Sequence, residues 1–271
     1  MNAPTAPIRR FDGRTVLLSG GGRGIGESTA RRFADEGADV LVVARSRDEI
    51  DAVAASIVER GGRAWAHAAD VADPAQVDAV VAAAGERWGR IDVLVNCAGI
   101  DHDSPFLDFP EERWRAVLDV NLTGAFLMAQ RVARVMAEGG GGAIVHISSI
   151  DAYGADGNQV AYNASKAGML GLNRTMATEL APYGIRSNVV APGYTSTPLT
   201  RQYIGDELYT HMTEDFARVP QRRMATPDEI AGAVLFLASD DAAAITGAEL
   251  TVDGGTTANL YIVETLPSPG S

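Results

Sequence analysis

The stretch Ser19-Gly20-Gly21-Gly22-Arg23-Gly24-Ile25-Gly26 decides the fold of this chain. It follows a short strand-forming run, Thr15–Ser19, and leads directly into a segment of helical periodicity at Glu27–Gly37. Glycines allow positive φ angles and a close approach of the backbone to a ligand, and the first turn of the helix offers free N–H groups to an anion. An ordinary strand-to-helix turn is the alternative, but the strand-loop-helix context favours the pyrophosphate site of a bound dinucleotide.

Short β-branched runs alternate with longer helical segments along the rest of the chain. Such an alternation is typical of a parallel, doubly wound sheet, because each crossover returns over the sheet as a helix. The runs expected as strands are Thr15–Ser19, Val40–Ala44, Ala64–Ala68, Val93–Asn96, Ala143–Ser148, Ser187–Ala191 and Glu249–Val252. We therefore predict an α/β fold: a single Rossmann-type doubly wound domain with a mostly seven-stranded parallel sheet over residues 11–259. A flexible N-terminus (1–10) and a C-terminal tail (260–271) flank it.

Capping residues mark two helix starts, Asp73-Pro74 and Thr226-Pro227-Asp228-Glu229. A side-chain oxygen at the N-cap, a proline in the first turn and early acidic residues all stabilise a helix N-terminus. The glycine run Gly139–Gly142 predicts a loop before the fifth strand. Tyr194–Val219 is a long insert between the sixth strand and the last helix, where a substrate lid could sit.

Charge and composition narrow the classes of partner. The chain has 271 residues, with 23 Lys and Arg against 35 Asp and Glu, a formal net charge of -12. This charge repels nucleic-acid phosphates and anionic lipids, so we expect no nucleic-acid or membrane partner and favour a small-molecule ligand. The first residues show no secretory signal, and no apolar run reaches the roughly 18 residues that a membrane span needs.

Cysteine and histidine usage indicates neither disulfides nor a metal site. Cys97 is the single cysteine, which excludes an intramolecular disulfide and is typical of a cytoplasmic protein. A small buried filler is the expected role of this thiol. The four histidines lack ligand spacing; they are His67, His102, His146 and His211.

Positively charged residues stand where the second strand ends. Dinucleotide-binding folds place there either an acid that accepts from the ribose 2′-hydroxyl or an Arg that receives a 2′-phosphate. Here Val43–Arg47 contains no acid, and Arg45 is joined by Arg23 of the glycine loop. A guanidinium forms charge-assisted bonds with phosphate, so we favour NADP(H) over NAD(H). The alternative is that Arg45 and Arg47 only solvate a helix start.

The sequence Tyr162-Asn163-Ala164-Ser165-Lys166 begins a helix-forming stretch. A spacing of four residues places Tyr162 and Lys166 on one helix face, where the ammonium is expected to lower the phenol pKa from its usual value of about 10 towards working pH. Such a pair also occurs by chance in many helices. The upstream run Ile144–Ser149 ends a buried strand with two hydroxyl side chains, at the edge of the sheet where open α/β folds bind ligands. This context favours a catalytic pair.

With these residues the chain resembles the classical short-chain dehydrogenase/reductase family, in particular the 3-oxoacyl-carrier-protein reductases. The resemblance extends from Phe11 to Asn259. Ser19–Gly26 is similar to the family's Thr-Gly-x-x-x-Gly-x-Gly loop with Ser for Thr, and Asn96-Cys97-Ala98-Gly99 to its Asn-Asn-Ala-Gly with Cys second. Asp70-Val71 is similar to the family's adenine-contacting pair.

The resemblance implies a catalytic tetrad of Asn121, Ser149, Tyr162 and Lys166. Ser149 would hydrogen-bond the substrate oxygen, Tyr162 would transfer the proton, and Lys166 would lower the phenol pKa and hold the nicotinamide ribose. Asn121 would support a water relay to Lys166. Ser148 is then expected to be structural.

The expected cofactor contacts combine the glycine loop, the cations and the family motifs. They are Gly20, Gly22, Arg23, Gly24, Ile25, Gly26, Arg45, Ser46, Asp70, Val71, Asn96, Ala98, Gly99, Tyr162, Lys166, Pro192, Gly193, Thr195 and Thr197. Within this set, the segment from Pro192 to Thr197 resembles the one that contacts the carboxamide in the family.

Asp101, Asp151 and Gln159 occupy positions that line the substrate side in the family resemblance. Two acids and an amide suit a polyhydroxylated or cationic substrate, although solvated loop acids remain the alternative, because Asp is a common turn residue.

These observations together favour an enzyme that interconverts a ketone and a secondary alcohol by hydride transfer with NADP(H). The family resemblance also implies a homotetramer or homodimer. Two other functions remain open: a reductase of 3-oxoacyl thioesters, and a non-catalytic sensor that binds a dinucleotide.

Overall fold

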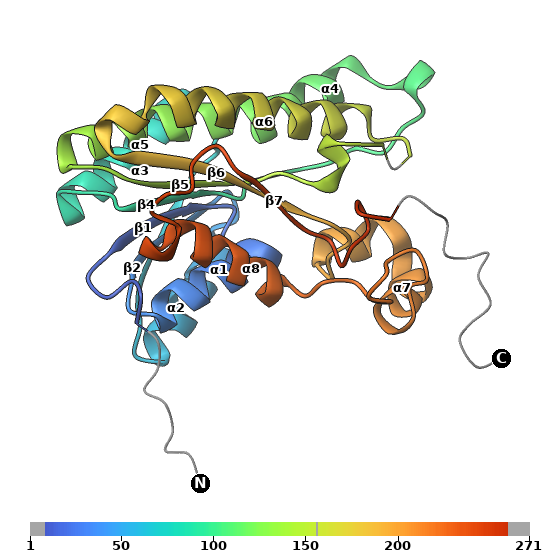
Figure 1. The fold of residues 1–271 in the computed structure, drawn as a ribbon, viewed down its shortest axis with the longest axis horizontal. Helices are drawn as coiled ribbons and strands as arrows, with labels where there is room; N and C mark the ends of the chain where they lie inside the picture. Colours follow the sequence, from blue (N-terminus) through green and yellow to red (C-terminus); the bar gives the residue numbers. More distant parts are fainter. Residues whose placement is uncertain (1–8, 156, 260–271) are drawn as a thin grey trace, which may run out of the picture.

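One sheet of seven parallel strands, in the order β3-β2-β1-β4-β5-β6-β7, forms the centre of the molecule in the computed structural model, which describes residues 9–155 and 157–259 (Figure 1). The strands are β1 (Thr15–Ser19), β2 (Asp39–Ala44), β3 (Arg63–Ala68), β4 (Val93–Asn96), β5 (Gly142–Ile147), β6 (Ile185–Pro192) and β7 (Glu249–Val252). All six neighbouring pairs are parallel. The predicted α/β fold with a seven-stranded parallel sheet is confirmed.

Helices cover both faces of this sheet. They are α1 (Gly24–Asp35), α2 (Arg47–Glu59), α3 (Pro74–Trp88), α4 (Glu111–Leu118), α5 (Gly124–Gly139), α6 (Val160–Glu179), α7 (Pro198–Glu214) and α8 (Pro227–Ala238). Figure 1 shows α3, α5 and α6 on one face and α1, α2 and α8 on the other. This is the two-sided cover that right-handed crossovers between parallel strands produce.

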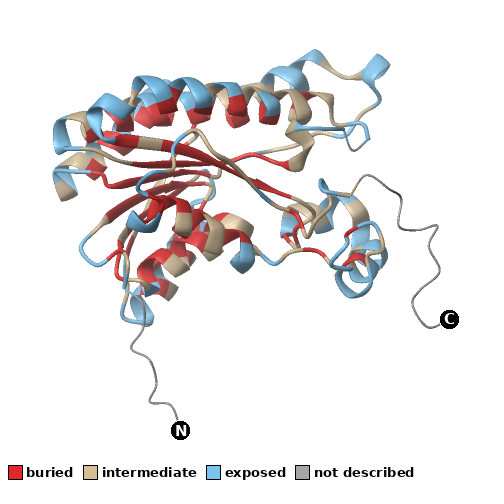
Figure 2. Ribbon diagram, viewed as in Figure 1, coloured by how far each residue is buried: buried red, intermediate tan, exposed pale blue. Residues whose placement is uncertain are grey.

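The core lies between the sheet and each helix layer, as the buried residues in Figure 2 show. Alternate side chains of β1 divide between the two layers: Val16 and Leu18 belong to the cluster on the α1, α2 and α8 side, whereas Leu17 belongs to the other. Successive strand side chains point to opposite faces, so the middle of a strand that is buried on both faces is a continuous apolar run.

The two predicted helix starts are confirmed. Asp73 accepts hydrogen bonds from the backbone N–H groups of Ala75 and Gln76, and Thr226 and Glu229 form a reciprocal capping box.

Several strand boundaries differ from the sequence prediction. The Gly139–Gly142 loop was predicted too long, because α5 continues to Gly139 and β5 begins at Gly142. Only Gly140 and Gly141 remain between them, with φ angles of 90° and 112°. Strand β5 ends at Ile147, so Ser148 lies just past the sheet, although its backbone N–H still donates to the Val190 carbonyl.

The sheet brings the expected site residues to one edge. The chain runs outward from β1 to β2 and β3, and then returns to β4 on the other side of β1. Open α/β sheets bind ligands outside the carboxyl ends of the strands at such a reversal. The Tyr194–Val219 insert contains α7, which Figure 1 shows beyond both helix layers. This helix is interrupted at Gly205, where φ is 77° and ψ is 168°.

Packing contacts begin close to the N-terminal end of the described residues. Phe11 packs edge-on against Phe33, and Arg10, from the segment expected to be flexible, makes two hydrogen bonds of 2.7 Å with the Glu36 carboxylate. The predicted tail, 260–271, and residues 1–8 lie outside the described residues.

Candidate active site

A cleft of about 690 Å³ opens at the carboxyl ends of the strands and is closed on one side by α7. Almost all the site residues predicted from the sequence line it. They are Gly20, Gly22, Arg23, Gly24, Ile25, Gly26, Arg45, Ser46, Asp70, Val71, Ala98, Gly99, Asp101, Ser149, Asp151, Gln159, Tyr162, Lys166, Pro192, Gly193, Thr195 and Thr197. The predictions that do not line it are Asn96 and Asn121.

The glycine loop is packed so closely that side chains are excluded from it. A Cβ at Gly20 would lie 2.5 Å from the backbone nitrogen of Ala98, and φ at Gly20 is 73°. A Cβ at Gly26 would overlap the carbonyl oxygen of Gly20. The loop backbone is therefore exposed to the cleft at the start of α1, whose N–H groups face outward. This is a cradle that fits the pyrophosphate of a dinucleotide.

The far end of the cleft, beyond the glycine loop, carries opposite charges. Arg45 is exposed and its guanidinium lies 3.9 Å from the Asp70 carboxylate. Arg47 turns away and donates to Asp51 at 2.9 Å. Of the two arginines that end the second strand, only Arg45 lines the cleft.

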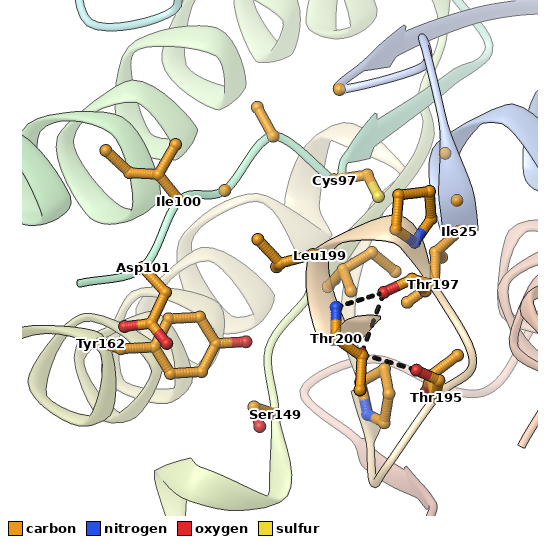
Figure 3. A pocket seen from close by; sticks show the side chains of 18 of the residues that line it. Ile25, Cys97, Ile100, Asp101, Ser149, Tyr162, Thr195, Thr197, Leu199 and Thr200 are labelled. Carbon is orange, nitrogen blue, oxygen red and sulfur yellow. Dashed lines mark hydrogen bonds between the residues drawn. The ribbon is translucent and has the colours of Figure 1, made fainter. Parts of the chain in front are cut away.

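The segment from Pro192 to Thr197, which is expected to contact the carboxamide, leads into α7 and forms hydrogen bonds with its first turn. Thr195 donates from its hydroxyl to the Gly193 carbonyl, and the Thr200 hydroxyl donates to the Thr195 carbonyl at 2.7 Å. Thr197 is the N-cap of α7 and accepts from the Thr200 N–H. Figure 3 shows these threonines across the cleft from Tyr162 and Ser149.

Tyr162, Ser149 and Lys166 meet at the end of β5. The Lys166 side chain is buried, donates to the Ile147 carbonyl at 2.7 Å, and lies 5.3 Å from the centre of the Tyr162 ring. The Ser149 hydroxyl donates to Asp151 at 3.0 Å. Tyr162 and Lys166 therefore share a helix face, as predicted. The Ser148 hydroxyl donates to the Lys166 carbonyl at 3.0 Å, which is compatible with the structural role expected for it.

The titration of Tyr162 differs from the prediction. Burial raises the pKa of Tyr162 above its usual value, the Asp151 and Asp101 carboxylates raise it further, and the hydrogen bond with Ser149 acts in the opposite direction. The prediction that Lys166 lowers the pKa of Tyr162 is therefore wrong: the pKa is raised, and Lys166 is not among the groups that shift it. The ammonium is held by the Ile147 carbonyl, and burial lowers its own pKa to about 8. The phenol is consequently protonated at neutral pH.

Asn121 lies behind the cleft and forms hydrogen bonds with Ile100 and Ser165. It is fully buried in a π-helical turn, Asp119–Thr123, between α4 and α5. Its amide accepts from the Ile100 N–H at 2.8 Å, donates to the Ile100 carbonyl at 2.9 Å and donates to Ser165 at 3.0 Å. A Cβ on Gly99 would lie 3.5 Å from the Asn121 oxygen and 3.6 Å from the Lys166 nitrogen, so both side chains flank Gly99.

Asn96 does not reach the cleft and is not retained among the cofactor contacts. Its side chain is buried and donates to the Ala125 carbonyl of α5 at 3.1 Å, beside the buried ring of His146. The strand register explains the difference: Asn96 is paired with His146 within the sheet, and both side chains point into the helix layer formed by α5. Burial lowers the pKa of His146 to about 4, so the ring is neutral.

The three predicted substrate-side residues form one wall of the cleft. Asp101 accepts from the His102 N–H at 2.7 Å and from the Gln159 amide. Burial raises the pKa of the Asp101 carboxyl. Figure 3 shows Asp101 beside the Tyr162 ring. These acids are therefore held in place beside the phenol.

Comparisons with known proteins agree with this geometry. The chain matches the family model described as Enoyl-(Acyl carrier protein) reductase over residues 20–257. It is 44% identical over 253 residues to L-rhamnose 1-dehydrogenase (NAD(P)(+)) of Azotobacter vinelandii, which covers 91% of this chain and 98% of that protein. The chain belongs to the short-chain dehydrogenase/reductase family.

One further relative and one solved structure are similar to almost the whole chain. A 3-oxoacyl-(acyl-carrier-protein) reductase of Thermotoga maritima is 38% identical over 246 residues, covering 91% of this chain and 98% of that protein. The crystal structure of a short-chain type dehydrogenase/reductase from Mycobacterium marinum has a TM-score of 0.86 at 36% identity, covering 92% of this chain and 97% of that one. The chain is accordingly an oxidoreductase that acts on CH–OH groups with a nicotinamide dinucleotide.

Residues that the sequence did not identify also line the cleft of this family member. Tyr203, from α7, donates its hydroxyl to the Asp101 carbonyl at 2.7 Å and links the insert to the substrate side. No sequence signal marks it, because the contact joins residues 102 positions apart. Glu49, in the first turn of α2, lines the far end.

The described residues include neither a helix that could cross a membrane nor a cluster of potential metal ligands. No helix in the described ranges has both the length and the apolar character that a membrane span requires. Within the same ranges no group of three or more His, Cys, Asp or Glu side chains could hold a metal ion. Cys97 lines the cleft, and burial raises the pKa of its thiol to about 11, so the thiolate is not populated at neutral pH.

Asp151→Asn should move the pH profile of alcohol oxidation. The Asp151 carboxylate raises the pKa of Tyr162 by opposing the phenolate, so removing its charge lowers that pKa. With Tyr162 as the expected base of oxidation, kcat/KM is expected to rise as pH increases through the pKa of Tyr162. We expect this limb to shift to lower pH.

Asp103→Asn is the matched control for this experiment. Asp103 also lines the cleft but is not among the groups that shift the pKa of Tyr162. An unchanged limb in Asp151→Asn, or an equal shift in Asp103→Asn, would contradict the assignment of the shift to Asp151.

Proposed function

We propose that this protein interconverts a ketone and a secondary alcohol, prefers NADP(H), and uses Tyr162 as its acid and base. The observation that carries the proposal is the position of Tyr162 between Ser149 and the buried Lys166, in a cleft whose other part is the glycine loop. A proton-transfer group and a dinucleotide cradle in one cleft support chemistry on a substrate held between them.

Each residue of the group has a defined task in this proposal. During reduction the protonated Tyr162 gives its proton to the carbonyl oxygen, and during oxidation the phenolate takes it back. Ser149 holds the same substrate oxygen, and the Lys166 ammonium binds the nicotinamide ribose. Asn121 positions the Ile100 backbone and Ser165 behind them. The bound nicotinamide supplies the carbon that donates or accepts the hydride.

The preference for NADP(H) is supported by Arg45 and Arg23, both of which line the cleft. A guanidinium beside the ribose forms charge-assisted bonds with a 2′-phosphate and has no comparable partner in NAD(H).

Arg45→Ala should weaken NADPH binding by about tenfold to a hundredfold and leave NADH binding within about threefold, because only the 2′-phosphate loses a charged partner. Fluorescence titration of the purified protein measures both dissociation constants. Arg47→Ala is the matched control, since Arg47 is two residues away and bonds to Asp51 outside the cleft. Equal losses for both nucleotides, or the same loss in the control, would refute the role of Arg45.

Activity is tested on a panel of ketones, secondary alcohols, sugars and polyols followed at the nicotinamide absorbance. Polyhydroxylated compounds are tested first. Asp101 and Asp151 can accept hydrogen bonds from substrate hydroxyls beside Tyr162, and the Gln159 amide can donate one. The similarity to a rhamnose dehydrogenase supports the same choice. Tight nucleotide binding with no turnover on a broad panel would favour a dinucleotide sensor instead.

The similarity to the Thermotoga maritima protein favours one second candidate, reduction of 3-oxoacyl thioesters. The net charge of -12 opposes the approach of an acidic carrier protein. A 3-oxoacyl thioester on a small carrier belongs in the panel for this reason, and its faster turnover than any polyol would replace the leading assignment.

We propose a homotetramer, or failing that a homodimer, in the cytoplasm. Exposed aromatic side chains on the outer helices support assembly: Trp114 on α4 and Phe126 on α5 are both exposed. The single cysteine is compatible with a reducing compartment.

A further inference from the structure

Glu49 lies in the first turn of α2, three residues after the N-cap residue Ser46. Ser46 and Glu49 have the spacing of a capping box, in which each side chain bonds to the other's backbone N–H. Thr226 and Glu229 have the same spacing at α8 and do form the box: the Thr226 N–H donates to the Glu229 carboxylate at 2.8 Å, and the Glu229 N–H donates to the Thr226 hydroxyl at 3.2 Å. The two helices therefore provide an internal comparison.

The box does not form at α2. The Ser46 side chain makes no cap hydrogen bond. Within residues 9–155 and 157–259, the Glu49 carboxylate takes part in no hydrogen bond or ion pair. It lies instead against the glycine loop, where a Cβ added to Gly22 would be 3.0 Å from its Oε2. The carboxylate is thus exposed on the wall of the cleft.

The far end of the cleft therefore carries two charges of each sign. Arg23 and Arg45 are the cations, and Asp70 and Glu49 are the carboxylates. Arg45 and Asp70 already face each other at 3.9 Å. Among the described residues, neither Glu49 nor Arg23 has a side-chain hydrogen bond or ion pair, so Glu49 is the carboxylate of this group without a protein partner.

A carboxylate and a guanidinium select opposite groups on the ribose. A carboxylate accepts a hydrogen bond from a 2′-hydroxyl, and it repels a 2′-phosphate. In dinucleotide-binding folds the ribose lies beside the end of the second strand, next to the glycine loop, which is where Arg45 and Gly22 stand here. The protein places both kinds of group at this point.

We propose that Glu49 is a specificity-determining residue that admits NAD(H) to a site in which Arg45 favours NADP(H). Its carboxylate receives the 2′-hydroxyl of NAD(H) and limits the affinity for the 2′-phosphate. The inference rests on the proposed function, since it requires a dinucleotide in this cleft.

Glu49→Gln tests the proposal by binding alone, through fluorescence titration of the full-length protein with NADH and NADPH. The variant keeps the shape of the side chain and removes its charge. We expect NADH binding to weaken and NADPH binding to tighten, so that the ratio of the two dissociation constants changes about tenfold in favour of NADPH, or 1.4 kcal/mol.

Asp48→Asn is the matched control. Asp48 is exposed on the same turn of α2 and does not line the cleft, so this variant removes an equal charge from the helix N-terminus. In Asp48→Asn the ratio of the NADH and NADPH dissociation constants should stay within about twofold of wild type. An unchanged ratio in Glu49→Gln, or the same change in Asp48→Asn, overturns the role of Glu49 while leaving the proposed function intact. A wild-type protein that binds neither nucleotide overturns both.

Discussion

Tyr162→Phe should lower kcat by about a thousandfold or more while leaving the dissociation constant of NADPH within about twofold of wild type. The substitution removes the hydroxyl that donates or accepts the proton and keeps the ring that lies beside Lys166. A positioned acid or base contributes about 10² to 10⁴ in rate, and no other described group in the cleft stands ready to replace it. Stopped assays on the best substrate of the panel, with nucleotide titration alongside, measure both quantities.

Lys166 and Ser149 are poor substitutes for the missing phenol. Lys166 is held by the Ile147 carbonyl, and the Ser149 hydroxyl is engaged by Asp151. Neither is arranged to pass its own proton to the substrate. The residual rate in the variant should therefore come from positioning alone.

Tyr153→Phe provides the control for this variant. Tyr153 is 45% exposed, and its hydroxyl donates to Glu249 at 3.2 Å at the protein surface. Loss of this hydroxyl should leave kcat within about twofold, as surface substitutions usually do. Wild-type activity in Tyr162→Phe would eliminate the proposed acid and base, and with it the mechanism.

The sheet and the glycine loop could be predicted from the sequence because both follow from local rules. The middle of strand β1, Val16–Leu18, is apolar and fully buried, and a Cβ added at Gly20 or Gly26 would collide with neighbouring backbone. Periodicity and glycine placement record such constraints directly. For the same reason the pair Tyr162 and Lys166 could be placed on one helix face from their spacing alone.

The electrostatics of the site could not be predicted in the same way. The pKa of Tyr162 depends on burial and on Asp101, which is 61 residues away in the sequence and reaches the phenol only through the fold. The spacing of Tyr162 and Lys166 could be read along the helix, but the hydrogen bond from the Lys166 ammonium to the Ile147 carbonyl could not. Glu49 shows the same limit, since its spacing matches a cap that the tertiary structure does not use.

Gly26→Ala should abolish measurable nucleotide binding and destabilise the protein by several kcal/mol. A Cβ at this position would overlap the Gly20 carbonyl oxygen and lie 3.0 Å from the Gly21 Cα, so it can be accommodated only by moving the loop backbone. Overpacking costs about 1–3 kcal/mol where side chains can yield, and here the obstacle is backbone. Displacement of the loop also removes the N–H groups that face the pyrophosphate.

Gly85→Ala separates this effect from the ordinary cost of adding a methyl group to a helix. Gly85 lies within α3, and a Cβ there meets nothing within 4 Å. Alanine is the better helix former by about 1 kcal/mol, so this variant should raise the free energy of unfolding in urea and bind NADPH as wild type does. If Gly26→Ala also bound NADPH with wild-type affinity, the glycine loop could not be the site that binds the pyrophosphate. The substitution must displace the loop backbone, and that displacement would then have had no effect on the ligand.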